Sequence, residues 1–214
     1  MNVNAEFRLT KTSERILEFL LGNMTKEFSM NAISEAVGIS YPLVRERILE
    51  LSKVGIVNIK EINPTQSLCS LNTKNNDNVS IFSYVEFLRK DKFLSRKKEL
   101  KTITDDILGR ITDNSFTMIL FGSHARSGER PSSDIDILFL VSSISDESRV
   151  KNAVGTADRL TSRKIHAITM AYDDFFDALK KGSANLPKEV LENHIIVYGA
   201  EAFYRSLAML AIYG

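Results

Sequence analysis

The chain has 214 residues and a formal net charge of +1, so its overall charge does not predict nucleic-acid binding and any basic surface must be local. Its single cysteine, Cys69, excludes an intramolecular disulfide and a cysteine-based metal cluster, as expected in a reducing compartment. No apolar run approaches the ~20 residues of a membrane-spanning helix, and no signal-peptide pattern is present, so we expect a cytoplasmic protein without a membrane partner.

The first third of the chain predicts three helices followed by a β-hairpin. Thr12 or Ser13 can cap the first helix, and Ser29 or Asn31 can cap the second, which Gly38 closes. The expected helices cover 12–21, 29–37 and the stretch from Ser40 to Gly55, and the expected strands cover 56–62 and 67–71, with a turn at 63–65.

This order of elements is that of a winged helix-turn-helix. The run from Ile33 to Ser40, ISEAVGIS, and the apolar pattern that follows it resemble bacterial and archaeal winged-helix regulators, whose third helix enters the major groove of DNA. The resemblance implies binding to double-stranded DNA, a homodimer, and DNA-facing side chains at Ser40, Tyr41, Arg45 and Arg47.

A second interpretation of the winged helix is a module that packs only against the rest of the chain or against a protein partner. Glu46 and Glu50 favour it, because carboxylates on the third helix repel phosphate. Residues 1–78 carry nine Lys or Arg and nine Asp or Glu, so this region has no net positive charge.

Residues 79–111 predict one long helix, or two helices broken near Asp91. Between positions 86 and 101, seven Lys or Arg side chains face only three Asp or Glu. This basic stretch is either a solvated helix face or a surface that holds DNA or an RNA substrate.

The last third of the chain alternates strands and helices, which predicts a small mixed sheet with helices on one side. The expected strands are 116–121, 135–141, 164–170 and 194–198, and the expected helices are 145–160, 173–181 and 200–213, with a loop around Pro187.

One motif in this region combines a phosphate-binding turn with two acids. The apolar strand at 116–121 runs into Gly122 and Ser123, and Asp134 and Asp136 open the next strand. Residues two apart in a strand project from one face, so the two carboxylates lie side by side. Carboxylates in this arrangement suit a hard divalent cation, Mg²⁺ or Mn²⁺.

Residues 113–200 resemble the nucleotidyltransferase superfamily of DNA polymerase beta, and most closely its small prokaryotic minimal nucleotidyltransferases. The resemblance implies that Gly122 and Ser123 cradle the phosphates of ATP or another nucleoside triphosphate. It also implies that Asp134 and Asp136 hold Mg²⁺ or Mn²⁺. Further nucleotide contacts are expected from Arg126 and Ser133.

The strand over 164–170 departs from the superfamily pattern, which has a third carboxylate there. The best-aligned residue is His166. A neutral imidazole can act as a base near pH 7 or bind a metal, but it supplies no negative charge for a second cation. His166 is therefore either catalytic or a polar residue in a reduced or metal-independent nucleotide pocket.

We thus expect an α/β protein with a winged helix-turn-helix at 1–75, a helical linker at 76–112 and a nucleotidyltransferase-like domain at 113–214. Three functions remain open. The chain is a nucleotidyltransferase acting on an acceptor hydroxyl, a transcriptional regulator that senses a nucleotide, or an antitoxin-like module that acts on a toxin partner.

Overall fold

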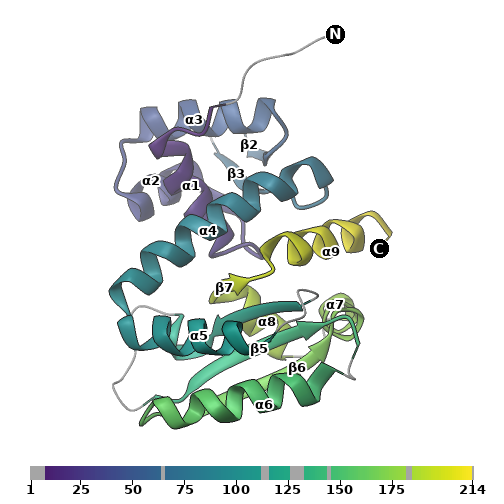
Figure 1. Ribbon diagram of the computed structural model, residues 1–214. Helices are drawn as coiled ribbons and strands as arrows, with labels where there is room; N and C mark the ends of the chain where they lie inside the picture. Colours follow the sequence, from purple (N-terminus) through teal and green to yellow (C-terminus); the bar gives the residue numbers. More distant parts are fainter. Residues whose placement is uncertain are drawn as a thin grey trace.

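The winged-helix region contains three helices and a small antiparallel sheet. The computed structural model describes residues 8–63, 66–111, 116–125, 133–143, 146–181 and 185–213. Figure 1 shows this region above the larger C-terminal sheet, with one long helix crossing between them. Its elements are α1 (Lys11–Leu21), β1 (Phe28–Ser29), α2 (Met30–Val37), α3 (Tyr41–Lys53), β2 (Val57–Asn63) and β3 (Gln66–Leu71).

Two details of the winged helix differ from the sequence prediction. Thr10 rather than Thr12 or Ser13 caps α1, because its hydroxyl accepts a hydrogen bond from the Ser13 N–H at 3.1 Å. Strand β1 was not predicted. It pairs antiparallel with β3 and completes a sheet of order β1-β3-β2, and its two residues are too few to produce a periodic pattern.

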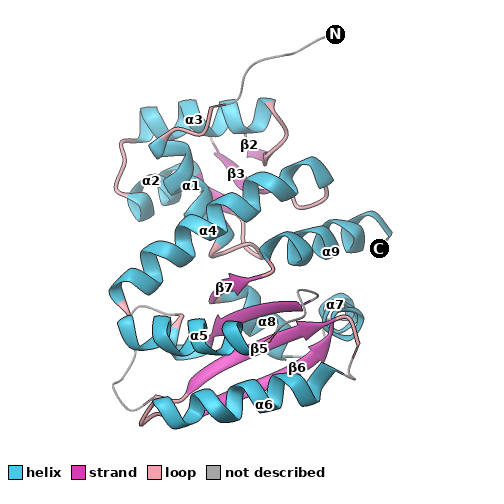
Figure 2. Cartoon of the chain, in the orientation of Figure 1, coloured by secondary structure: helices cyan, strands magenta, loops and turns pink. Residues whose placement is uncertain are grey.

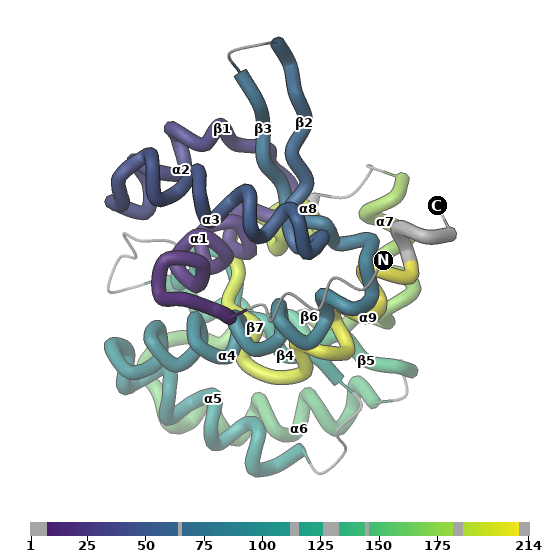
Figure 3. Tube along the Cα trace, turned by 90° about the horizontal axis from the view of Figure 1, so that it is seen from above, coloured from purple at the N-terminus to yellow at the C-terminus, as the bar shows by residue number. Residues whose placement is uncertain are grey.

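The β2–β3 hairpin forms the wing. Figure 3 shows it extending away from the rest of the chain. Ser29 caps α2 and Gly38 ends it with a φ of 61°, as the sequence predicted. The winged helix-turn-helix is therefore confirmed in its helices, its turn and its hairpin.

The basic stretch forms two helices, α4 (Val79–Arg96) and α5 (Lys98–Arg110), preceded by a short turn of 3₁₀ helix at Asn76–Asn78. The break is at Lys97, whose backbone leaves the helical region with φ −126° and ψ 72°, and not near Asp91 as predicted. Figure 2 shows α4 crossing the molecule between the winged helix and the C-terminal sheet. Lys92 on α4 donates to Glu14 and Glu18 of α1 at 2.6 and 2.5 Å.

The C-terminal sheet has four strands in the order β6-β5-β4-β7. β5 runs parallel to β6, whereas β4 runs antiparallel to both β5 and β7. The elements are β4 (Phe116–Phe121), a 3₁₀ turn η2 (Gly122–His124), β5 (Ile135–Val141), α6 (Glu147–Ala157), a 3₁₀ turn (Asp158–Leu160), β6 (Ile165–Ala171), α7 (Tyr172–Lys181), α8 (Asn185–Glu192), β7 (His194–Tyr198) and α9 (Ala200–Tyr213).

Helices cover both faces of this sheet, so the prediction of helices on one side was wrong. Met118, Leu120 and Ile137 pack in a core with residues of α5 and α6, whereas Ile119 and Leu138 pack with residues of α4, α7, α8 and α9. The reason lies in the strands themselves. Every residue of β4 is buried, and a strand that is apolar on both sides needs a cover on each.

The expected loop around Pro187 was also wrong, because this stretch forms α8. Pro187 lies in the first turn of α8, where a backbone N–H would have no acceptor within the helix. The N–H that proline lacks is therefore not missed at this position. In the described ranges, no helix is both long enough and apolar enough to cross a bilayer.

A buried polar cluster joins α4, β7 and α9. The fully buried carboxylate of Glu86 accepts hydrogen bonds from Arg89 and, at 2.9 Å, from the Tyr204 hydroxyl. Arg89 also donates to the carbonyl of His194 at 3.1 Å. Burial opposes ionisation of Glu86, but the Arg89 guanidinium, the neighbouring His194 ring and the hydrogen bond from Tyr204 together outweigh it and keep the Glu86 pKa below its ordinary value of 4.5. The His194 Nε2, at 3.5 Å, is too far away to donate a hydrogen bond.

Candidate nucleotide site

The turn predicted to bind phosphate begins where β4 ends. Gly122 has a φ of 69°, a left-handed conformation that glycine adopts without strain. A Cβ at this position would lie 2.6 Å from Oδ2 of Asp136, so the Gly122 backbone and the Asp136 carboxylate are in direct contact. Ser123 follows within η2 and is half-buried. The structure thus brings together the turn and one of the two predicted acids.

Both carboxylates lie at the start of β5 as the alternation predicted. Asp136 pairs in register with Phe121 on β4, and Asp134 is exposed just before the strand. Ile135 and Ile137 point to the opposite face and are fully buried. Asp134 and Asp136 therefore lie at the same edge of the sheet as Gly122 and Ser123.

His166, the residue predicted at the position of a third acid, lies on β6 next to Asp136. It is the register partner of Asp136, and its Nδ1 lies 3.4 Å from the Asp136 Oδ1. The His166 side chain is 59% exposed, so solvent and a ligand can reach it. Lys164, two residues earlier on the same face, is also exposed. The structure thus places His166 beside Asp136, and its catalytic role stays a prediction.

His124 is a residue that sequence reasoning missed. Its side chain is fully buried, and its Nε2 lies 3.1 Å from the backbone oxygen of Ser133, to which it donates in the Nε2–H tautomer. This contact joins the end of the phosphate-binding turn to the residue before Asp134. A histidine directly after Gly-Ser, in a turn otherwise made of small residues, was the signal available in the sequence. Arg126, the predicted nucleotide contact, lies outside the described residues.

The donor set fits one hard divalent cation. Asp134 and Asp136 offer carboxylate oxygens, and His166 offers a nitrogen beside them. Within the described ranges no group of three or more His, Cys, Asp or Glu side chains is already arranged to hold a metal ion. A second cation would lack a carboxylate from β6, because that position is His166.

The predicted DNA face on α3 is partly available. Tyr41 is 42% exposed and Arg45 is exposed, at the start and middle of the helix. Arg47, in contrast, donates to Glu46 at 2.9 Å and to Glu50 on its own helix. Ser40 precedes α3 without capping it through its side chain, and its hydroxyl is exposed. Tyr41 and Arg45 are thus better placed for DNA than Arg47.

The search of curated proteins gives no match. Among solved structures, the crystal structure of a zinc-responsive MarR family member, Lactococcus lactis ZitR, is 22% identical, with a TM-score of 0.34 over 47% of this chain. The present chain spans 66% of that chain, just under two thirds. A similarity at this TM-score is too low to bear on the fold or ligand of the chain.

The third comparison concerns the C-terminal half. Residues 98–197 match the family model described as "Nucleotidyltransferase domain". This range runs from the first turn of α5 into β7 and includes Gly122, both carboxylates and His166. The match makes residues 98–197 similar to a nucleotidyltransferase domain and supports the transfer of nucleotidyl groups as the general activity of this stretch.

Proposed function

We propose that this protein is a metal-dependent nucleotidyltransferase that moves a nucleoside monophosphate from ATP or another nucleoside triphosphate to an acceptor hydroxyl. The observation that carries the proposal is the direct contact between the Gly122 backbone and the Asp136 carboxylate. A turn suited to phosphate and an acid suited to a cation are adjacent, as a metal-bound triphosphate requires.

The proposed reaction is one displacement at phosphorus. The acceptor oxygen forms a bond to the α-phosphorus, the bond to the pyrophosphate oxygen breaks, and pyrophosphate leaves with its negative charge. A Mg²⁺ or Mn²⁺ ion held by Asp134 and Asp136 would supply the positive charge that such a triphosphate needs. Ser123 and the backbone of the turn hold phosphate oxygens, and Arg126 and Ser133 contribute further contacts.

His166 is the residue that receives the proton of the acceptor hydroxyl in this proposal. A neutral imidazole can accept a proton, and the His166 Nδ1 lies 3.4 Å from the Asp136 Oδ1. The exposure of His166 leaves room for an acceptor beside it.

The same histidine favours a second candidate function. With an imidazole in place of the third carboxylate, the site would bind a nucleotide and one cation without turnover. The chain would then be a transcriptional regulator that senses a nucleotide and binds double-stranded DNA through Tyr41 and Arg45 of α3. As a homodimer it would contact two half-sites of the DNA.

The test uses a triphosphate labelled at its α-phosphate, with Mg²⁺ or Mn²⁺ and a panel of acceptors. Transferase activity predicts a labelled product and released pyrophosphate, both lost in Asp134→Asn and Asp136→Asn. Asp173→Asn is the matched control, because Asp173 is an exposed carboxylate on α7 outside the site. Metal-dependent triphosphate binding without pyrophosphate release would favour the sensor. Failure of the wild type to bind triphosphate would contradict both.

A further inference from the structure

The C-terminal sheet ends at β6 on one side and at β7 on the other. β6 is the last strand of the order β6-β5-β4-β7, and among the described strands only β5 pairs with it. At the opposite end of the sheet, α4 packs against β7, and Arg89 of α4 donates to the His194 carbonyl at 3.1 Å. In the described part of the chain, only the first residue of β6, Ile165, has a comparable partner on its outer edge.

Alternate residues of β6 direct their backbone N–H and C=O groups away from β5. The Lys164 carbonyl accepts a hydrogen bond from the Ile135 N–H at 2.9 Å, so Lys164 and every second residue after it face β5. The residues between them face outward. Ile165 is the first of these, because its N–H donates to the Asp158 carboxylate at 3.0 Å and not to β5. The outward-facing residues that follow are Ala167, Thr169 and Ala171.

β6 is apolar like an interior strand but is not buried like one. Residues 137–140 of β5 are fully buried, whereas residues 167–171 of β6 are only half-buried. Outer strands are commonly protected from pairing by charged residues, a proline or a bulge. The β6 sequence, IHAITMA, contains no proline, lysine, arginine or acid, and its pairing with β5 continues without a bulge. Such an edge favours pairing with a further strand.

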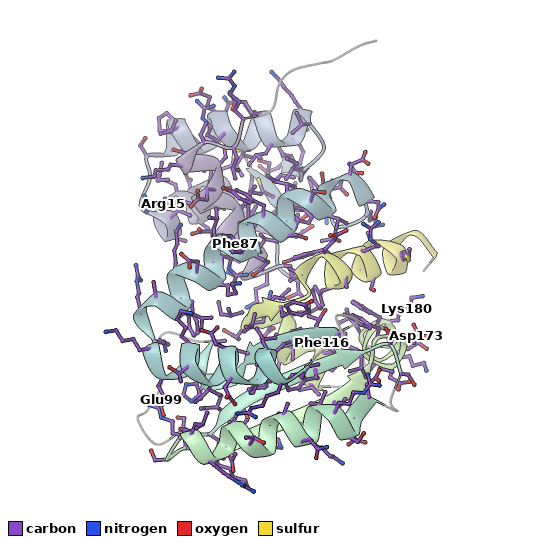
Figure 4. All side chains as sticks on the ribbon, viewed as in Figure 1. Arg15, Phe87, Glu99, Phe116, Asp173 and Lys180 are labelled. Atoms are coloured by element: carbon purple, nitrogen blue, oxygen red, sulfur yellow. The ribbon has the colours of Figure 1, made fainter. Side chains whose placement is uncertain are left out.

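Opposite charges flank β6. Lys164 is exposed directly before the strand, and Asp173 and Asp174 are exposed just after it, in the first turn of α7. Figure 4 labels Asp173 at the right-hand side of the molecule, where β6 ends and α7 begins. A second β6 in the antiparallel direction would bring its acidic end to Lys164, whereas a parallel copy would place like charges together. Charge complementarity therefore favours an antiparallel copy of the same strand.

We propose that two copies of this chain pair antiparallel through β6 and form one continuous sheet, with a two-fold axis at Ile168. In this register Ala167 faces the partner's Thr169, and the two exchange both backbone hydrogen bonds, because both direct these groups outward. Ile168 faces the same residue of the partner. Lys164 lies beside the partner's Tyr172, at the start of the acidic first turn of α7.

The pairing brings a partner side chain to the candidate nucleotide site. His166 faces the partner's Met170, with their Cα atoms about 4.5 Å apart, as in pairs without direct hydrogen bonds. His166 is 59% exposed beside Asp136, and the partner's Met170 covers part of its open side. Both winged helices lie on the same side of the joined sheet, as contact with two half-sites of one DNA requires. The role of the partner in nucleotide binding rests on the proposed function, whereas the pairing of β6 does not.

The first experiment measures the mass of the full chain by sedimentation over a dilution series. The wild type should sediment at twice the 24.1 kDa of one chain. Thr169→Pro should be a monomer, since proline lacks the N–H that the pairing needs. This N–H faces away from β5, so its loss removes no hydrogen bond within one chain, and proline is tolerated at such positions of outer strands. Thr169→Val keeps the N–H and should remain a dimer.

The second experiment tests the register by cysteine cross-linking. The native Cys69 is buried, which raises the pKa of its thiol to about 11, so it does not compete for the added oxidant. In Ile168→Cys the two new cysteines face each other across the axis, and their Cα separation of about 4.5 Å is within the ~4.4–6.8 Å of disulfides. This variant should form a covalent dimer. Ala171→Cys is the control, because its two cysteines lie about six residues apart along the strands, or ~20 Å, and should not cross-link.

The third experiment exchanges the charges at the ends of β6. Lys164→Glu should weaken the dimer about tenfold, because two exposed attractions per dimer become repulsions. Adding Asp174→Lys to Lys164→Glu should restore it. These variants and the cysteine pair decide the question even if Thr169→Pro does not fold.

Three results would overturn the proposed pairing. One is a wild type that stays monomeric at the highest concentration of the series. Another is a folded Thr169→Pro that dimerises like the wild type, which would place the interface elsewhere, for example on the winged helix. The third is equal cross-linking of Ile168→Cys and Ala171→Cys. Triphosphate binding is measured on the same wild-type sample, and its absence would refute the proposed function while a β6 dimer stands.

Discussion

Replacement of Gly122 by alanine tests the contact on which the candidate site depends. The new Cβ would lie 2.6 Å from the Asp136 Oδ2, below the 3.0 Å that real Cβ contacts respect. The Asp136 carboxylate must therefore move away from the turn. An alanine at φ 69° also carries the cost of the left-handed conformation, about 1–2 kcal/mol.

Gly55→Ala separates the two effects. Gly55 has a φ of 76°, but a Cβ there would meet nothing closer than the Asn75 side chain at 3.7 Å. Both variants should lose about 1–2 kcal/mol of unfolding free energy, which corresponds to a fall in Tm of about 2–8 °C for a chain of this size. Only Gly122→Ala should also disturb the cation site.

The assay is metal-dependent binding of a fluorescent nucleoside triphosphate, with unfolding followed in parallel. Gly122→Ala should weaken binding by about 10–100-fold, as a disturbed metal-ligand environment does, and Gly55→Ala should bind like the wild type. If both variants bind alike while losing the same stability, Asp136 does not take part in nucleotide binding.

Three further predictions concern the buried polar cluster around Glu86 and the residue His166 on β6. Tyr204→Phe removes a hydrogen bond to a buried carboxylate and should lower the unfolding free energy in urea by about 1.5–3 kcal/mol, whereas the exposed Tyr84→Phe should have no effect. Folding lowers the Glu86 pKa, so the ionised carboxylate contributes its full stabilisation above pH 4.5 and loses it as the pH falls through the pKa of the folded state. The urea midpoint of the wild type should therefore fall in acid, and the midpoint of Glu86→Gln should fall less. His166→Asp should raise pyrophosphate release if only the third acid limits turnover, and a fall would instead make the imidazole essential.

The sequence predicted the centre of the candidate site because its signals are local. Strands β4, β5 and β7 have the predicted limits, since each is a short apolar run beside polar or glycine residues. Alternation alone placed Asp134 and Asp136 opposite the buried Ile135 and Ile137. The roles of these residues stay predictions.

What the sequence did not predict depends on contacts between distant segments. Three features depend on residues far apart in the chain, so no short stretch of sequence predicts them. They are the second layer of helices, the pairing of β1 with β3 and the burial of His124. The break at Lys97 was misplaced because helical periodicity continues across it. Helix α8 was missed because a proline usually indicates a loop, and the sequence does not show that Pro187 lies in the first turn of a helix, where proline is tolerated.

One hydrophobic core is shared by the winged helix and the C-terminal sheet, and it determines how the chain should unfold. Ile16 of α1, Val85 of α4 and Phe203 of α9 belong to one buried cluster, which also contains Ile119 of β4. Separating the winged helix from the sheet would expose this shared apolar surface and break the hydrogen bond between Tyr204 of α9 and Glu86 of α4, and both losses cost free energy. We therefore expect a single calorimetric transition, with Tyr204→Phe moving it as a whole. Two separate transitions, or a shift of only one part in that variant, would mean that the two halves are independent units and that the polar cluster does not join them.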